Sequence, residues 1–251
     1  MKPRTAELRL EDPDKWSLFL DLDGTLVEVA ATPDGVSVPP DLPPLLGRVA
    51  AALDGAVAIV SGRRIANIDH LLAPVKLIAA GVHGAELRTA VDGEIGYAAK
   101  PLADGLVEAV SGLTRLLPGV LVEPKGTSLT VHYRAAPSAG PAIEALLKTA
   151  IRLGGLDLIL CPGRKVFEVV PEHVSKGSAL ERLVQLPPFR SRRPIMIGDD
   201  VSDESALEAA TRLGGLGLKV AGEHFPKEAA DFEGPADVRA WLAELAQRVR
   251  I

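Results

Sequence analysis

Cysteine is almost absent from this chain of 251 residues. Cys161 is the only one, so no intrachain disulfide can form. It ends the apolar run 158–161 and has no evident base beside it in the sequence, which is typical of a packed thiol and not of a nucleophile. Because 47% of the residues are hydrophobic, the chain can build a sizeable core as one large domain or two small ones.

An excess of positive charge and long apolar runs are also missing from the sequence. The formal net charge is −5, which gives no support to binding of nucleic acid or of an anionic membrane surface. The chain begins with charged residues and its first apolar run is interrupted by Asp21, so we predict neither a signal-peptide core nor a membrane span, and we expect a cytoplasmic protein. Repeats, low-complexity tracts and coiled-coil heptads are absent from the sequence as well, and no feature of it predicts an oligomeric state.

The order of apolar segments predicts two kinds of domain. Strand-length runs alternate with helix-period segments in residues 1–101 and 172–251, which predicts a doubly wound parallel sheet in a Rossmann-like α/β core. Residues 102–171 follow the order helix, strand, strand, helix, strand, strand, which predicts an inserted α+β cap domain of αββαββ type. Residues 1–15 are polar and are expected to form a loosely ordered arm.

The boundaries expected from these patterns can be stated for each element. Core strands are expected near 17–22, 56–60, 76–80, 194–197 and 216–220, and core helices near 45–53, 65–72, 176–186, 204–213 and 236–249. In the insertion we expect helices near 106–117 and 141–153 and strands near 121–125, 128–134, 156–161 and 165–170.

Two carboxylates follow the apolar run 18–20, where the first expected strand ends in a loop. Asp21 and Asp23 lie two residues apart, so their side chains point the same way, and carboxylates held close together favour a cation or a proton between them. Gly24 and Thr25 then supply backbone N–H groups in a tight turn that can cradle an anion. Asp-Gly is also a common turn dipeptide, so this stretch by itself fits a plain turn equally well.

Polar residues also follow the strands expected at 56–60 and 76–80. Ser61 lies between a strand and a helix, where a hydroxyl can hold an oxyanion or serve only as an N-cap. Gly62 and Arg63 complete that turn. His83 lies between two glycines in the next loop, where contact with a ligand and stabilisation of a turn are both plausible.

An acidic loop follows the strand expected at 194–197. Asp199 comes directly after that strand and Asp203 follows, and such carboxylates can hold Mg²⁺ or form a solvated loop that caps the next helix. Lys176 precedes a helix in the same half of the core and is either a surface cation or a group that offsets the charge of a transferring phosphoryl group. In an open parallel sheet, ligands bind beyond the carboxyl ends of the strands, so we expect these stretches to converge on one crevice.

These stretches, in their order along the chain, resemble the motifs of the haloacid dehalogenase superfamily of phosphohydrolases. The matching segments are DLDGT at 21–25, the serine of SGR at 61, the lysine of SKG at 176 and GDDVSD at 198–203. Within that superfamily the chain is most similar to trehalose-6-phosphate phosphatases, over about residues 16 to 245. The segments that carry this narrower resemblance are AGVHGAE at 80–86, VEPKGTSLTVHYR at 122–134 and GRKVFEVVP at 163–171.

The resemblance implies a role for each matching core residue. Asp21 would be the nucleophile that becomes an aspartyl phosphate, and Asp23 would protonate the leaving sugar oxygen and later deprotonate water. Mg²⁺ would bind Asp21, the backbone carbonyl of Asp23 and Asp199, with Asp203 close behind. Ser61 and Lys176 would hold the phosphoryl oxygens. Further substrate contacts are expected from Gly24, Thr25, Gly62, Arg63 and His83.

The resemblance also implies a substrate, trehalose 6-phosphate, whose sugar hydroxyls would be contacted by residues of the cap. Those residues are Glu123, Lys125, Arg134 and Glu168. Three alternatives remain open at this point: a phosphatase of sucrose phosphate or of mannosyl- or glucosyl-phosphoglycerate, a phosphosugar mutase, and a non-catalytic phosphosugar-binding module. A non-catalytic module is expected to lose the nucleophile or a metal carboxylate, and this chain keeps both.

Overall fold

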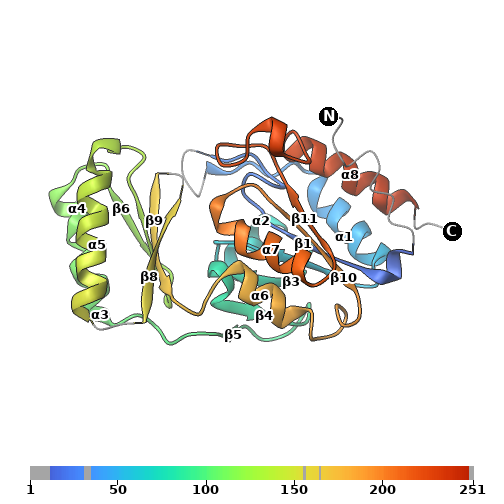
Figure 1. The fold of residues 1–251 in the computed structure, drawn as a ribbon, viewed down its shortest axis with the longest axis horizontal. Helices are drawn as coiled ribbons and strands as arrows, with labels where there is room; N and C mark the ends of the chain where they lie inside the picture. The colour runs from blue at the N-terminus through green and yellow to red at the C-terminus, as the bar shows by residue number, and fades with distance from the viewer. Residues whose placement is uncertain (1–11, 31–34, 155–156, 164, 249–251) are drawn as a thin grey trace. The chain divides into compact units, whose positions relative to one another are not determined.

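The computed structural model describes residues 12–30, 35–154, 157–163 and 165–248. Most of the predicted arm at 1–15 therefore lies outside the described residues. The chain forms two compact units, one made of residues 1–96 and 175–251 and the other of residues 97–174 (Figure 1). No helix of the described ranges is both long and apolar enough to cross a membrane.

The first unit contains a sheet whose described strands lie in the order β11-β10-β1-β2-β3-β4-β5 (Figure 1). The five strands from β11 to β3 are parallel, as a doubly wound core requires. Their bounds are β1 (Trp16–Leu20), β2 (Val57–Val60), β3 (Ile78–Gly81), β10 (Arg193–Gly198) and β11 (Leu216–Lys219). Phe19, Leu20 and Ile59 are fully buried because helices cover both faces of such a sheet.

The helices of this unit pack in pairs, α1 against α8 and α6 against α7. Their bounds are α1 (Leu42–Ala52), α2 (Ile65–Leu71), α6 (Lys176–Leu183), α7 (Glu204–Arg212) and α8 (Pro235–Arg248). Helices and strands begin and end within a few residues of the predicted positions. The prediction of a Rossmann-like α/β core is confirmed.

The edge of the sheet differs from the prediction. The short strand β4 (Glu86–Arg88) runs antiparallel to β3, and β5 (Gly96–Tyr97) follows it. Glu86 and Arg88 are only 3% and 4% exposed, although both are charged. Arg88 donates to both carboxylate oxygens of Asp69, at 2.6 and 2.7 Å, which supplies the partner that a buried guanidinium requires. A search for apolar runs could not detect such a strand.

The second unit is a four-stranded antiparallel sheet of order β6-β7-β9-β8 with helices on one face. Its elements follow the predicted αββαββ order, with the first helix in two parts. Buried Leu129, Val131 and Phe167 of the sheet form a core with Ile143 and Leu147 of the long helix α5. The bounds are α3 (Asp104–Ser111), α4 (Leu113–Leu116), β6 (Leu121–Pro124), β7 (Leu129–His132), α5 (Gly140–Gly154), β8 (Leu158–Gly163) and β9 (Val166–Pro171).

Candidate active site

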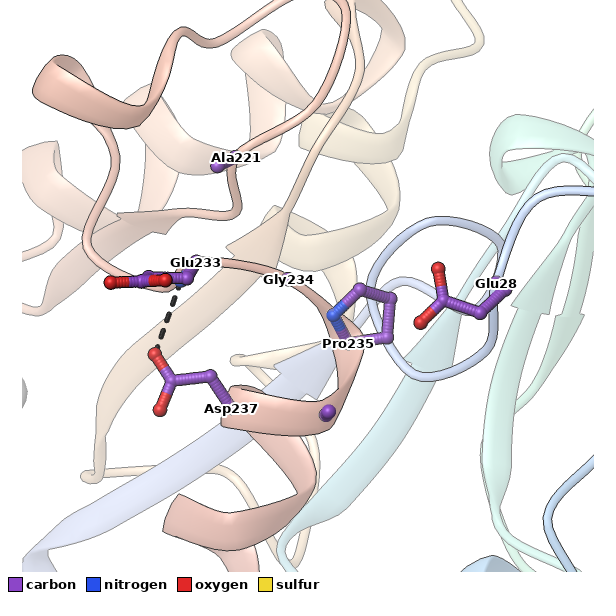
Figure 2. Close-up of a pocket in the computed structure, with 7 residues that line it drawn as sticks. Glu28, Ala221, Glu233, Gly234, Pro235 and Asp237 are labelled. Atoms are coloured by element: carbon purple, nitrogen blue, oxygen red, sulfur yellow. Dashed lines mark hydrogen bonds between the residues drawn. The ribbon is translucent and has the colours of Figure 1, made fainter.

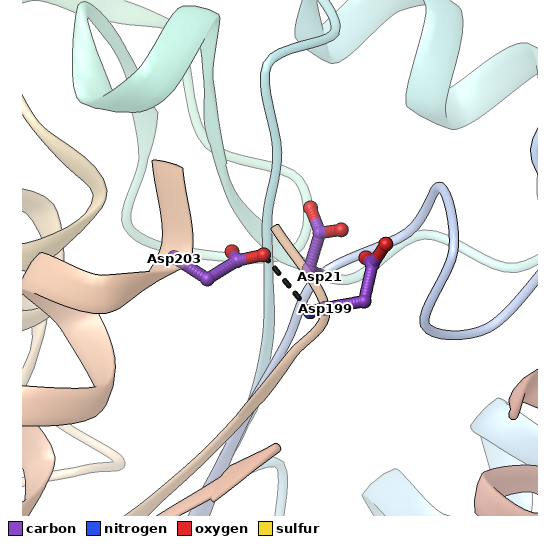
Figure 3. Close-up of side chains that lie close together, drawn as sticks. All are labelled: Asp21, Asp199 and Asp203. Carbon is purple, nitrogen blue, oxygen red and sulfur yellow. Dashed lines mark hydrogen bonds between the residues drawn. The ribbon is translucent and has the colours of Figure 1, made fainter. Parts of the chain in front are cut away.

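Three aspartates meet beyond the carboxyl ends of β1 and β10, which are neighbours in the sheet. Asp21 follows β1, Asp199 follows β10, and Asp203 lies in the short 3-10 turn Val201–Asp203 that precedes α7. One carboxylate oxygen of each lies within 4.8 Å of the others (Figure 3). Asp21 and Asp199 are 3% and 8% exposed, and Asp203 is fully buried. The parallel pairing of two strands thus brings together residues that are 178 positions apart in the sequence.

Lys176 is the cation among these carboxylates. Its Nζ donates to Asp21 Oδ1 and to Asp203 Oδ1, both at 2.7 Å, and the residue is 3% exposed. Burial would lower the pKa of Lys176, yet the negative charges of Asp203 and Asp21 raise it above its ordinary value. Ser175 caps the helix that Lys176 begins, since its side chain accepts the N–H of Ser178 at 3.0 Å. Lys176 therefore stays charged and fixes the orientation of Asp21.

Asp203 also shapes the loop that carries Asp199. Its Oδ2 accepts the backbone N–H group of Asp199 at 3.1 Å, as Figure 3 shows, and that of Asp200 at 3.0 Å. Gly198 permits this approach, because a Cβ at that position would lie 2.4 Å from the carboxylate carbon of Asp203. Both oxygens of Asp203 are thus engaged by the protein, which gives this residue a supporting position behind Asp21 and Asp199.

The three carboxylates of Asp21, Asp199 and Asp203 carry more negative charge than Lys176 alone can offset. Burial raises the pKa of Asp21 well above its usual range, the charge of Asp203 adds to this shift, and Lys176 opposes it. Burial likewise raises the pKa of Asp199 to about 7, with Asp203 adding again. Buried like charges that crowd in this way favour a cation among them, and carboxylate oxygens are the ligands that a hard divalent cation takes. The residues fit a divalent metal site.

The turn after Asp21 is held close against Asp199. Thr25 Oγ1 donates to Asp199 Oδ1 at 3.1 Å. Gly24 has a φ of +88°, and a Cβ there would lie 2.1 Å from Asp199 Oδ2, so both the backbone conformation and the space require glycine. The first and the last of the four motifs, which are 174 positions apart at Thr25 and Asp199, are thus in direct contact.

Asp23 has a different partner from Asp21. Its two carboxylate oxygens accept bonds from Arg63 Nε at 2.6 Å and Arg63 Nη2 at 2.8 Å. The side chain of Asp23 is 32% exposed, whereas that of Asp21 is 5% exposed. The sequence led us to expect that the two carboxylates share a cation or a proton. In the structure each is instead paired with its own basic residue, because the Arg63 loop lies against the end of β1.

The loop after β2 carries Ser61, Gly62 and Arg63 to the same edge of the sheet. Ser61 is 1% exposed and its Oγ accepts the N–H of Arg63 at 3.2 Å, as an N-cap-like side chain would. The His83 ring lies over Gly62, since a Cβ on Gly62 would be 2.6 Å from His83 Nε2. The backbone N–H of His83 donates to the carbonyl of Ser61 at 3.0 Å. His83 therefore packs on the turn that holds Ser61.

Glu86 is a supporting residue that the sequence patterns did not single out. Its carboxylate accepts the backbone N–H of Ile65 at 2.7 Å and the Nε of Arg64 at 3.2 Å. These contacts hold the start of α2 and so the loop 61–63 that precedes it. Glu86 could have been noticed in the sequence, because it is the acidic residue of the segment 80–86, which resembles a motif of the family.

The residues predicted in the cap also gather, within the second unit. Lys125 Nζ lies 3.5 Å from Glu168 Oε1 and 3.9 Å from Glu123 Oε2. Arg134 lies in the turn after β7 and is exposed. Glu123, Lys125 and Glu168 thus form one charged group, although 45 positions separate the first from the last.

A separate pocket of about 600 Å³ lies in the first unit and contains none of the predicted residues (Figure 2). It is lined by the start of α8 and by three acidic residues, Glu28, Glu233 and Asp237. Asp237 accepts the backbone N–H of Glu233 at 3.1 Å (Figure 2). Such an acidic lining would repel a phosphate dianion, so we do not assign the substrate to this pocket.

Solved structures share this fold. The C-terminal domain of a trehalose-6-phosphate phosphatase from C. albicans aligns with a TM-score of 0.77 at 21% identity, over 93% of this chain and 92% of that one. A protein described as related to trehalose-6-phosphate phosphatase aligns with a TM-score of 0.72 at 24% identity, over 92% of this chain and 97% of that one. At these identities the likeness establishes the fold alone.

Sequence comparison establishes the family. The chain is 41% identical over 210 residues to a probable trehalose-phosphate phosphatase of Sinorhizobium fredii, which covers 83% of this chain and 79% of that protein. It is 35% identical over 230 residues to the trehalose-6-phosphate phosphatase of Escherichia coli, which covers 91% of this chain and 85% of that protein. The family model described as trehalose-phosphatase matches residues 19–235. The chain therefore belongs to the trehalose-phosphatase family.

Proposed function

We propose that this chain is a Mg²⁺-dependent phosphatase that hydrolyses trehalose 6-phosphate to trehalose and phosphate through a phosphorylated Asp21. The observation that carries this proposal is the buried Asp21 carboxylate, held by Lys176 beside Asp199 in a chain of the trehalose-phosphatase family. A doubly charged sugar phosphate does not cross a bilayer unaided, so the enzyme is expected in the compartment where that substrate is made, which we propose to be the cytoplasm.

In the first half of the reaction, a carboxylate oxygen of Asp21 attacks phosphorus. The bond between phosphorus and the sugar oxygen breaks, and Asp23 gives its proton to that oxygen, so that trehalose leaves as a neutral alcohol. Lys176 keeps the attacking carboxylate in one orientation and offsets part of the negative charge around it. Arg63 orients the ionised carboxylate of Asp23 through two hydrogen bonds, and one of these bonds must open when Asp23 carries the proton that it gives to the sugar oxygen.

In the second half, water attacks phosphorus of the aspartyl phosphate. Asp23 takes a proton from that water, the bond between phosphorus and Asp21 breaks, and inorganic phosphate leaves. Asp23 thus gives a proton in the first half and regains one in the second, so the cycle ends in its starting state. We propose that Ser61, together with the turn residues Gly24, Thr25 and Gly62 and the nearby His83, binds the phosphoryl group.

The metal site would be formed by Asp21, the backbone carbonyl of Asp23 and Asp199, with Asp203 supporting Asp199 from behind. When bound, Mg²⁺ would offset the repulsion between the Asp21 carboxylate and the phosphate dianion. Mg²⁺ suits this site because it takes few carboxylate ligands and completes its shell with water and phosphate.

We further propose that residues 102–171 act as a cap that selects the sugar. This segment contains none of the four phosphoryl-transfer motifs, but it does contain the charged group of Glu123, Lys125 and Glu168. Carboxylates accept hydrogen bonds from sugar hydroxyls and the ammonium group donates to them, so the group suits a polyhydroxyl ligand. Arg134 would add a further contact.

Removal of the metal is expected to abolish turnover. With excess chelator, phosphate release should fall to background, and added Mg²⁺ should restore it. Mg²⁺ should also raise the thermal unfolding midpoint, because a ligand that binds only the folded state stabilises it. Asp199→Ala should lose both effects, whereas Asp92→Ala, at an exposed turn, should keep them. Full activity of the wild-type chain in excess chelator would contradict the proposed metal site.

The substrate is tested by measuring phosphate release from a panel of phosphosugars with Mg²⁺ present. The panel contains trehalose 6-phosphate, sucrose 6-phosphate, mannosyl-3-phosphoglycerate and glucosyl-3-phosphoglycerate. We expect the highest kcat/KM with trehalose 6-phosphate. A higher value with another member would replace the proposed substrate, and an isomerised phosphosugar without free phosphate would identify a mutase instead.

A further inference from the structure

The sheet of the second unit has two unlike faces. Successive residues of a strand point to opposite faces. Leu129 and Val131 of β7 are buried against the helices, so Thr130, which lies between them, belongs to the opposite face. The same alternation in β9 places Phe167 and Val169 in the core and Glu168 on that opposite face. The face that turns away from the helices therefore carries Thr130 and Glu168, next to the apolar Val166 and Val170 of β9.

The register of the four strands aligns one residue from each. Glu123 of β6 pairs with Thr130 of β7, Thr130 pairs with Glu168 of β9, and Glu168 pairs with Cys161 of β8. His132, two positions beyond Thr130 on β7, lies on the same face.

Two residues that were not among the predicted site residues hold the carboxylates of this face. Thr130 Oγ1 donates to Glu168 Oε1 at 3.1 Å, and Thr130 is 1% exposed. His132 Nε2 lies 3.1 Å from Glu123 Oε2. Because a carboxylate only accepts, the proton of this bond belongs to His132 Nε2. The bond to His132 lowers the pKa of Glu123, and the charge of Lys125 acts in the same direction against the effect of burial.

These bonds restrict the carboxylates without using up their capacity to accept. A carboxylate has two oxygens and about four lone-pair sites, so one hydrogen bond together with the nearby ammonium group of Lys125 can fix its orientation while leaving acceptor sites. An unrestrained Glu side chain loses rotamer entropy when a ligand orders it. A restrained one has lost that freedom before the ligand arrives, which is the basis of preorganised binding.

We propose that Thr130 and His132 are positioning residues that orient Glu168 and Glu123 toward the hydroxyl groups of the sugar. Selectivity for a polyhydroxyl phosphate would then depend on two residues that act only through their neighbours. This inference rests on the proposed function, because it assumes that Glu123 and Glu168 contact the sugar.

The test compares variants that remove each bond with variants that keep it. Thr130→Val and His132→Leu remove the donor, whereas Thr130→Ser and His132→Gln keep one. We expect the first pair to lower kcat/KM for trehalose 6-phosphate about 10- to 100-fold, mainly through KM, and for p-nitrophenyl phosphate less than about threefold. The second pair should stay within about threefold of wild type on the sugar phosphate. Thr149→Val, on an exposed part of α5, is the matched control for loss of a threonine hydroxyl.

A double-mutant cycle separates positioning from a direct contact. If Thr130 acts only through Glu168, then Thr130→Val should cost less than about twofold in a Glu168→Ala background, and likewise His132→Leu in a Glu123→Ala background. Additive losses in either cycle would overturn the positioning role for that pair. The rate with p-nitrophenyl phosphate reports that each variant is folded and has a working catalytic core.

The outcomes distinguish this inference from the function on which it rests. If the wild-type chain released no phosphate from trehalose 6-phosphate, the proposed function would fail, and this inference with it. If the wild-type chain hydrolysed the sugar phosphate while Thr130→Val and His132→Leu kept full kcat/KM, or lost it equally on both substrates, only the inference would fail.

Discussion

Asp21→Asn is expected to abolish hydrolysis of every phosphate ester, with a loss of roughly four orders of magnitude or more in kcat. An amide cannot attack phosphorus, so no phosphoenzyme can form on any substrate. Asparagine keeps the size of the side chain, and its amide oxygen can still accept the bond from Lys176. Because burial raises the pKa of Asp21, its charge is unfavourable in the folded state, and a neutral side chain should not lower the thermal unfolding midpoint.

Acid quench with a labelled phosphate ester measures the intermediate directly. The wild-type chain should retain label after acid treatment, and the Asp21→Asn variant should retain none. Asp92→Asn, at an exposed turn, is the control for loss of a carboxylate elsewhere in the same unit. Label retained by the Asp21→Asn variant would show that the nucleophile is another residue.

Asp23→Asn is expected to separate good from poor leaving groups. The alkoxide of a sugar needs a proton as it leaves, whereas nitrophenolate leaves with far less help. The variant should lose about 10²- to 10⁴-fold with trehalose 6-phosphate, as removal of a general acid does, yet still be phosphorylated by p-nitrophenyl phosphate. Since Asp23 also serves as the base for water, the resulting phosphoenzyme should decay slowly and accumulate.

Single-turnover measurements with both esters test this assignment. The Asp23→Asn variant should show a burst of nitrophenolate followed by a slow steady state. Its thermal unfolding midpoint should change little, because the amide oxygen of asparagine can still accept one of the two bonds from Arg63. A normal rate with the sugar phosphate would show that Asp23 is not the acid.

Apolar patterning carried most of the information about the fold. The runs at 17–22, 56–60 and 194–197 predict strands that the structure contains, because a strand covered on both faces must be apolar along its whole length. The same rule placed Asp21 and Asp199 at strand ends, where they are found. It missed β4, since Glu86 and Arg88 are buried by pairing with charged groups and not by being apolar.

The α/β core, the αββαββ insertion and the chemical type of each motif could be predicted from local patterns of residues, because neighbouring residues specify strands, helices and turns. The pairing of the charged groups could not be predicted in this way and depends on the packing of the folded chain. The position of α6 brings Lys176 to Asp21, the loop after β2 brings Arg63 to Asp23, and the register of β7 and β9 brings Thr130 to Glu168. Each of these pairs joins residues that are far apart in the sequence, and a local sequence pattern does not indicate such contacts. In both units the sequence indicated which residues are chemically important, and the fold determined which residues they contact.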